Sequence, residues 1–288
     1  MLQQTRVAAV LPYFERFLKR FPRVLDLAKA PESDLLTLWS GLGYYTRVRN
    51  LRQAAKQIVD LGEFPSDYDS IRHLAGIGDY TAAAVASIAF RLPHAVVDGN
   101  VRRVIARLTN DPEPDARGTA ERLLDARDPG RWNQAMMELG ALVCLPRKPD
   151  CAACPVARHC EAKEHGTEQD LPQKRLRPAT ESIERTLLVI QDKERLLLTP
   201  SERVKGFWDL PEPYEGSVTG KTLGTFLHTI THRRYRFTVC RGTVLNIRKP
   251  LRWWMRQKIY EIPLSTTAKK ALRFLEDTTQ GVKLKVVR

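Results

Sequence analysis

The stretch "LAGIGDYTAAAVASIAF" (Leu74–Phe90) has the pattern of a helical hairpin, in which a short glycine turn joins two helices. Gly76 and Gly78 stand in the turn, and an alanine-rich run that favours a helix follows them. Glycines let the backbone turn sharply and let its N–H groups approach a phosphate closely. A single G-x-G is weak evidence for an anion site. The stretch therefore predicts the hairpin first and phosphate binding second.

A candidate catalytic carboxylate follows the hairpin in "VVDGNVRRVIARL" (Val96–Leu108). Asp98 precedes a helix that we expect to begin near Asn100. An aspartate at this place can cap the helix, because its side chain accepts a hydrogen bond from a backbone N–H of the first turn. Taken alone, helix capping explains Asp98 better than catalysis does.

Four of the five cysteines fall in "CLPRKPDCAACPVARHC", with the spacing C-x6-C-x2-C-x5-C. The chain has no export signal, so these residues are better metal ligands than disulfide partners. Zinc ribbons pair two C-x-x-C knuckles across a long gap, whereas one compact loop with four thiolates suits a 4Fe-4S cluster. Zinc and unligated thiols remain the alternatives. The predicted ligands are Cys144, Cys151, Cys154 and Cys160, and we expect the fifth cysteine, Cys240, to be a small core residue.

The positive charge is concentrated in the second part of the chain. Residues 172–288 hold 24 Lys and Arg against 11 Asp and Glu, whereas residues 1–171 hold 23 against 22. Such an asymmetry suits a polyanionic partner, with simple solubility charge as the alternative. No apolar run approaches the ~20 residues that span a bilayer, and the first residues do not form a signal peptide. We therefore expect a cytoplasmic protein with no membrane segment.

The spacing of apolar residues predicts two domains. The first is mostly helical and extends to residue 165; its predicted helices, besides an amphipathic one that starts near Val7, are Leu51–Leu61, Thr81–Phe90, Asn100–Leu108, Thr119–Asp125 and Trp132–Val143. Residues 166–182 carry proline, glycine and charge with no apolar period, so they read as a linker. Residues 183–288 predict an α+β domain around a mostly antiparallel sheet. Its predicted strand-like runs are Arg185–Gln191, Arg195–Pro200, Tyr235–Ile247 and Arg256–Leu264, and its predicted helices are Gly220–His228 and Thr267–Glu276.

Several motifs together are far more specific than any one of them. In order and spacing, the hairpin, "VDGNVRRV", "NQAMMELGALVC" and the cysteine loop (144–160) resemble the helix-hairpin-helix DNA glycosylases that carry a 4Fe-4S cluster. Within that superfamily, "MLQQTRV" and "GLGYYTRVRNL" are similar to the MutY family of adenine DNA glycosylases. The resemblance implies a monomer that works in base excision repair. It would hydrolyse the N-glycosidic bond of adenine mispaired with 8-oxoguanine or guanine in double-stranded DNA.

The resemblance also implies roles for three residues. Breaking the bond develops positive charge on the sugar, and Asp98 stands where the family keeps an ionised aspartate beside that charge. Tyr80 stands where bifunctional relatives such as endonuclease III carry a Schiff-base lysine, so a covalent amine is missing here. Asn100 falls on another active-site position of the family.

A duplex hides its bases, so the family must flip the adenine out and hold the gap open. The resemblance implies that Gln4 and Tyr44 wedge into the stack and that Leu2 and Gln134 line the adenine pocket. The hairpin backbone would hold phosphates. Two basic residues of the cysteine loop are further phosphate contacts, with chance surface charge as the alternative. The predicted DNA-binding residues are Leu2, Gln4, Tyr44, Gly76, Gly78, Gln134, Arg147, Lys148, Thr231 and His232.

The last two of these belong to a C-terminal domain that resembles the family's Nudix-like module for 8-oxoguanine recognition. "GFWDLPEPYEG" (Gly206–Gly216) is similar to its G-L-W-x-x-P signature. A Nudix box does not follow it, so we do not expect metal-dependent hydrolysis of nucleoside diphosphates. The family reads the lesion with a Phe-Ser-His loop. Here Ile230 replaces the aromatic residue, Thr231 keeps a hydroxyl, and His232 is retained.

The family's general acid is a glutamate just ahead of the "MLQQT" stretch, and here that stretch starts at Met1. General acid catalysis is typically worth ~10²–10⁴-fold. Two expectations follow. The natural protein is an adenine glycosylase that begins upstream, or this chain is a lesion-binding protein with little or no excision. A third class, a DNA-binding regulator with a redox cluster, leaves Asp98, Tyr80 and Gln4 unexplained.

Overall fold

The computed structural model describes residues 1, 7–173, 180–230, 233–247 and 249–279, and for residues 276–279 it describes the backbone alone. The chain divides into two compact units. The first unit joins Met1–Arg52 with Pro178–Arg288, and the second unit is Gln53–Arg177. The domain limits at residues 165 and 183 stay predictions.

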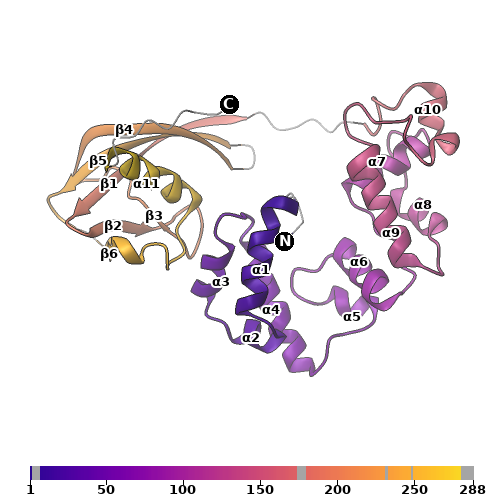
Figure 1. The fold of residues 1–288 in the computed structure, drawn as a ribbon, viewed down its shortest axis with the longest axis horizontal. Helices are drawn as coiled ribbons and strands as arrows, with labels where there is room; N and C mark the ends of the chain where they lie inside the picture. The colour runs from indigo at the N-terminus through magenta and orange to yellow at the C-terminus, as the bar shows by residue number, and fades with distance from the viewer. Residues whose placement is uncertain (2–6, 174–179, 231–232, 248, 280–288) are drawn as a thin grey trace. The chain divides into compact units, whose positions relative to one another are not determined.

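The second unit is built from helices (Figure 1). Its elements are the later part of α4 (Thr46–Leu61), then α5 (Tyr68–Arg72), α6 (Asp79–Phe90), α7 (Gly99–Leu108), α8 (Ala116–Leu123), α9 (Pro129–Glu138), the π-helical turn η1 (Leu139–Val143), the 3-10 turn η2 (Ala157–His159) and α10 (Glu161–His165). Three aspartates just ahead of α7, α8 and α9 accept hydrogen bonds from the first turn, as N-caps do. The predicted helices of this part are confirmed, and the run Trp132–Val143 changes from an α-helix to a π-turn after Glu138.

The first unit begins with α1 (Val7–Arg20), α2 (Val24–Lys29) and α3 (Glu32–Trp39), followed by the start of α4. The apolar face of the amphipathic helix α1 packs on α3. Phe17 lies edge-on against Trp39, with ring centroids 5.9 Å apart. Phe21 adds a second edge-on contact to Phe17, at 5.2 Å. The predicted helix at the start of the chain is therefore confirmed.

A six-stranded sheet and one helix complete the first unit, and we call them the sheet domain. The strands are β1 (Glu181–Asp192), β2 (Arg195–Pro200), β3 (Trp208–Asp209), β4 (Ser217–Ile230), β5 (Arg233–Val244) and β6 (Arg252–Met255). Their order is β3-β2-β1-β5-β4, with β6 beside β2. β1 and β5 run parallel and the other pairs run antiparallel, which confirms a mostly antiparallel sheet. The Nudix-like assignment of this domain stays a prediction.

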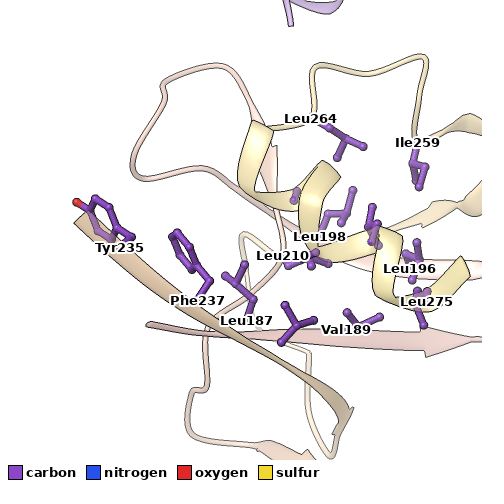
Figure 2. Packing of buried hydrophobic residues seen from close by; sticks show 14 residues of the cluster. Leu187, Val189, Leu196, Leu198, Leu210, Tyr235, Phe237, Ile259, Leu264 and Leu275 are labelled. Atoms are coloured by element: carbon purple, nitrogen blue, oxygen red, sulfur yellow. The ribbon is translucent and has the colours of Figure 1, made fainter. Parts of the chain in front are cut away.

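The helix α11 (Thr266–Thr279) covers one face of the sheet (Figure 1). Leu187 and Val189 of β1 lie in one buried cluster with Leu275 of the helix, as Figure 2 shows. The other face buries Leu188 and Ile190 with Cys240, which is 4% exposed. The expectation that this cysteine is a core residue is confirmed.

Two element predictions in the sheet domain are wrong. Gly220–His228 belongs to β4, where it pairs with β5, because its threonines and its Leu-x-x-Phe-Leu run suit a pleated surface and its two glycines weaken a helix. Arg256–Leu264 forms a 3-10 turn, η3 (Arg256–Lys258), and irregular chain, while the strand lies just before it in β6. Pro263 removes a backbone donor from that run.

Among the described helices, none is long and apolar enough to cross a membrane.

Candidate active site and cysteine cavity

The hairpin turn lies between α5 and α6, as predicted. Gly76 has φ +76°, a conformation that L side chains rarely adopt, and Gly78 is the N-cap of α6. A Cβ atom at Gly78 would meet nothing within 4 Å, so the backbone is accessible at this point. The turn is tied to α4, since the backbone N–H of Ala75 donates to Oε1 of Gln57 at 2.7 Å. This geometry can present backbone N–H groups to an anion.

Asp98 is the N-cap of α7. Its Oδ1 accepts from the backbone N–H of Val101 at 2.7 Å, and its Oδ2 accepts from Nδ2 of Asn100 at 3.3 Å. The capping role that the sequence favoured is therefore real. The same bonds hold the carboxylate in one orientation, with Asn100 directly beside it.

A buried asparagine fixes the segment that leads to Asp98. Asn133 of α9 is 2% exposed, and its Oδ1 accepts from the backbone N–H of Val96 at 3.0 Å. Its Nδ2 donates to Oγ of Ser87 and to the carbonyl of His94, both at 2.9 Å. All side-chain donors and acceptors of Asn133 are directed at this segment and at α6. The sequence analysis did not single out this residue.

Tyr80 lies at the start of α6, and its hydroxyl donates to Sδ of Met137 at 3.5 Å. Burial raises the pKa of Tyr80 above its ordinary value, and the negative charge of Asp98 raises it further. The phenol therefore stays protonated and neutral at physiological pH. Asn100 is hydrogen-bonded to Asp98, and the negative charge of Asp98 acts on Tyr80, so these three residues belong to one candidate site.

A chain of hydrogen bonds runs from Asp98 to the cysteine loop. Oδ1 of Asn100 accepts from Nη2 of Arg103 at 2.9 Å, and the same Nη2 donates to the carbonyl of Gly140 at 2.6 Å. Nε of Arg103 donates to the carbonyl of Cys144 at 2.9 Å. Arg103 is 8% exposed, and burial lowers its pKa from the ordinary value. The catalytic candidate and the cysteine loop are thus linked through one buried guanidinium.

Gly140 makes this chain possible because the π-turn comes very close to α7. A Cβ atom at residue 140 would lie 2.6 Å from Cβ of Asn100 and 3.1 Å from its carbonyl carbon. We expect Gly140→Ala to lower the free energy of unfolding by about 1–3 kcal/mol, as overpacking does. Chemical denaturation should show this loss, whereas Gly99→Ala, at a position with open space, should show almost none. Equal stability of both variants would contradict the close packing.

The four predicted ligand cysteines line one cavity, together with Arg107 and Glu168. Burial raises the pKa of Cys151 and Cys160 above the ordinary thiol value, and the nearby Glu168 adds to the effect at Cys151. In the described part of the chain, no three His, Cys, Asp or Glu side chains converge as they would on a single metal ion. The chemistry of the lining, with four cysteines of one loop around a single cavity, fits a cysteine-ligated metal group.

Arg107 supplies an independent test of that fit. It is 2% exposed, and its Nη1 donates to Sγ of Cys144 at 3.2 Å and to the carbonyl of Leu145 at 2.8 Å. Its Nε donates to the carbonyl of Leu171 at 3.2 Å. Among the described residues, Nη2 of Arg107 is one of few buried side-chain polar atoms without a hydrogen-bond partner. A cationic donor without a partner beside four thiols suits a sulfur-rich anionic group.

The remaining predicted site residues lie elsewhere. Tyr44 belongs to the first unit, in the turn between α3 and α4, and it is 57% exposed. Gln134 is exposed on α9, where its Nε2 donates to the carbonyl of Gly130 at 3.1 Å. Two further residues, the predicted phosphate contacts in the cysteine loop, are also exposed: Arg147 and Lys148. Four lie outside the described residues: Leu2, Gln4, Thr231 and His232.

Comparison with known proteins agrees with this geometry. Residues 1–127 match the family model described as HhH-GPD superfamily base excision DNA repair protein. A human adenine DNA glycosylase is 42% identical over 182 residues, which cover 59% of this chain and 33% of the human protein. The chain thus spans about a third of the length of that curated relative.

Two solved structures resemble the same part of the chain. One is a thermostable thymine-DNA glycosylase, with a TM-score of 0.53 at 28% identity over 57% of this chain and 80% of that chain. The other is a non-covalent endonuclease III–DNA complex, with a TM-score of 0.51 at 25% identity over 57% of this chain and 79% of that chain. The fold of this part of the chain is therefore similar to the folds of these two DNA-acting proteins. The hairpin and Asp98 both lie within the residues that match the HhH-GPD family model.

Besides Asn133, the sequence analysis missed three residues that support the site, namely Arg103, Arg107 and Gly140. A signal was available for the arginines. They stand four residues apart in "VRRVIARL", three and seven residues after Asn100, among apolar residues of a helix. Charged side chains are rarely found at helix positions whose spacing predicts burial, unless they have a partner in the core. The sequence carries no comparable signal for Gly140.

Proposed function

We propose that this chain is an adenine DNA glycosylase of base excision repair. It hydrolyses the N-glycosidic bond of adenine that is mispaired with 8-oxoguanine or guanine in double-stranded DNA. The observation that carries the proposal is the Asp98 carboxylate, oriented by two hydrogen bonds beside Tyr80 and Asn100 within an HhH-GPD domain. The 42% identity to a human adenine DNA glycosylase supports the choice of base.

Asp98 performs the central step. As the bond to adenine breaks, positive charge develops on the deoxyribose, and a fixed negative carboxylate stabilises that charge. The carboxylate needs no reorientation at that moment, because Val101 and Asn100 already hold both of its oxygens. Water then adds its hydroxyl group to the sugar carbon, and its proton goes to the departing adenine, which leaves as the neutral base.

Tyr80 decides between hydrolysis and strand cleavage. A lyase reaction needs an amine that forms a Schiff base with the sugar, and a phenol cannot supply one. Its raised pKa keeps the hydroxyl protonated, so Tyr80 can donate a hydrogen bond near Asp98 but cannot act as an anionic nucleophile. The enzyme is therefore monofunctional and leaves an abasic site.

The proposed DNA contacts are the ones that the resemblance of the sequence implies. The hairpin backbone at Gly76 and Gly78 binds phosphates, and Arg147 with Lys148 adds positive charge from the cysteine loop. Tyr44 and Gln4 hold the stack open, while Leu2 and Gln134 line the adenine pocket. Thr231 and His232 read the lesion from the sheet domain, whose positive charge favours DNA.

The cofactor is a 4Fe-4S cluster held by the four cysteines of residues 144–160. The cavity that they line and the unpaired guanidinium nitrogen of Arg107 support this assignment. When bound, the cluster supplies four iron–sulfur bonds that fix the loop. The residues of the chain do the rest: Arg103 ties the loop to Asn100, and the loop presents its two basic side chains to the backbone of DNA.

Product analysis with a labelled duplex tests the proposal. We expect free adenine from a duplex with adenine opposite 8-oxoguanine, and strand breaks only after treatment with alkali, because no amine stands at Tyr80. A duplex with thymine in place of adenine is the control. Strand breaks without alkali would contradict the monofunctional assignment. Tight binding without any adenine release would leave a lesion-binding protein.

A further inference from the structure

We call residues 40–45 the Tyr44 turn. Contacts on several sides fix the backbone of this turn, while the ring of Tyr44 is exposed. Tyr44 has φ +49° and is 57% exposed. The guanidinium of Arg47 lies 4.4 Å from the centre of its ring. Trp39, which is 2% exposed, donates from Nε1 to the carbonyl of Gly43 at 3.1 Å. The backbone around Tyr44 is therefore held from the side of α3.

The sheet domain holds the same turn through two contacts. Oγ of Ser40 donates to the carbonyl of Leu264 at 2.8 Å, and Ser40 is 6% exposed. The ring of Tyr45 packs on the ring of Phe207 with centroids 4.2 Å apart. Phe207 is 1% exposed, so almost its whole side chain is in contact with protein. The neighbours of Tyr44 on the chain thus touch two segments that lie more than 150 residues further along.

Those two segments are joined to each other, so they form one rigid support. The backbone N–H of Trp208 donates to the carbonyl of Pro263 at 2.8 Å, and the N–H of Ser265 donates to the carbonyl of Trp208 at 2.9 Å. The N–H of Ser201 donates to the carbonyl of Phe207 at 2.7 Å. These bonds fix Phe207 and Leu264 as neighbouring points on the sheet domain.

A third contact comes from α4, directly after the turn. Arg49 donates to the backbone carbonyl of Lys205 and, from Nε, to Oε1 of Glu32 at 2.7 Å. Gly206 has φ +82°, and a Cβ atom there would lie 2.9 Å from Cδ1 of Leu36. The "GFW" motif of the sheet domain thus approaches α3 and α4 more closely than another residue type would allow.

We propose that the sheet domain positions Tyr44, with Phe207 and Tyr45 as the positioning residues. This inference rests on the proposed function, in which Tyr44 wedges into the duplex beside the lesion. A tyrosine at positive φ persists only where its surroundings impose that backbone. A turn that is already ordered before DNA binds loses less conformational entropy on binding, which favours affinity. Through Tyr44, the sheet domain therefore helps to open the base stack of the DNA. This role is additional to its own proposed contacts with the lesion.

A double-mutant cycle tests this coupling. Phe207→Leu keeps the apolar bulk but removes the ring under Tyr45, and Tyr44→Ala removes the wedge. The readout is the Kd for a duplex that holds 8-oxoguanine opposite 2′-fluoro-2′-deoxyadenosine, which resists hydrolysis. We expect each single variant to bind about tenfold more weakly, a typical size for coupled residues, and the double variant to bind no more weakly than Tyr44→Ala. Losses that multiply in the double variant would overturn the inference.

Hydrogen–deuterium exchange of the protein without DNA gives a second readout. We expect faster exchange of the Tyr44 turn in Phe207→Leu. The matched control is Phe226→Leu, because Phe226 stacks on Phe237 and Phe274 inside the sheet domain. Unchanged exchange of the turn in Phe207→Leu would overturn the inference. A chain without preference for the lesion duplex would instead contradict the proposed function, and the exchange result would still decide the positioning.

Discussion

Asp98→Asn should lower the single-turnover rate of adenine release by about 10²–10³-fold or more, the size seen when a preorganised electrostatic group is removed from an active site. The substitution removes the negative charge that, in the proposed reaction, stabilises the developing sugar cation. It keeps a side-chain oxygen for the backbone N–H of Val101, and asparagine caps helices about as well as aspartate does. Binding of the lesion duplex and the free energy of unfolding should therefore change little.

Asp115→Asn is the matched control for this experiment. Asp115 caps α8 in the same way, with Oδ1 accepting from the backbone N–H of Gly118 at 3.0 Å. We expect its rate to stay within about twofold, because surface caps contribute stability and not catalysis. A full rate in Asp98→Asn would rule out a catalytic role for this carboxylate. Equal losses in both variants would assign Asp98 to helix capping alone.

Much of the fold could be predicted from the sequence because helices carry local signals. Asp98 marks one helix start, and the alanine-rich run after Gly78 marks another. The sheet domain was harder to predict. β4 was read as a helix because its strand character comes from pairing with β5, which is distant information that a short window does not contain.

The residues of the candidate site also fall into two groups: those that a local sequence pattern marks, and those whose role depends on contacts between distant segments. Chemistry and resemblance single out Asp98, Tyr80 and Asn100, and their roles stay predictions. The structure adds a hydrogen bond between Asn100 and Asp98. Gly140 and Asn133 were missed because their importance lies in close approach and in buried hydrogen bonds between elements far apart in sequence. Such contacts follow from the packed fold, and no residue pattern within one element announces them.

Arg107→Met should lower both the iron content of the purified chain and its free energy of unfolding. The substitution keeps an apolar stem of similar length but leaves the carbonyls of Leu145 and Leu171 without their donor. Each buried acceptor without a partner costs about 1–3 kcal/mol, so we expect a loss of about 2 kcal/mol or more. The loss should be accompanied by weaker visible absorption of the cluster, because Nη1 no longer supports Cys144.

Arg102→Met is the control, since Arg102 lies on the same helix and is exposed. It changes the net charge by the same amount, so any effect of charge alone on DNA binding appears in both variants. Iron analysis and chemical denaturation of the two variants separate the buried role from the charge. Full iron content together with unchanged stability in Arg107→Met would mean that this guanidinium does not support the cysteine loop. A loss confined to Arg107→Met would show that the loop depends on a residue of the same helix that Asp98 caps, and that cluster and catalytic carboxylate share one structural element.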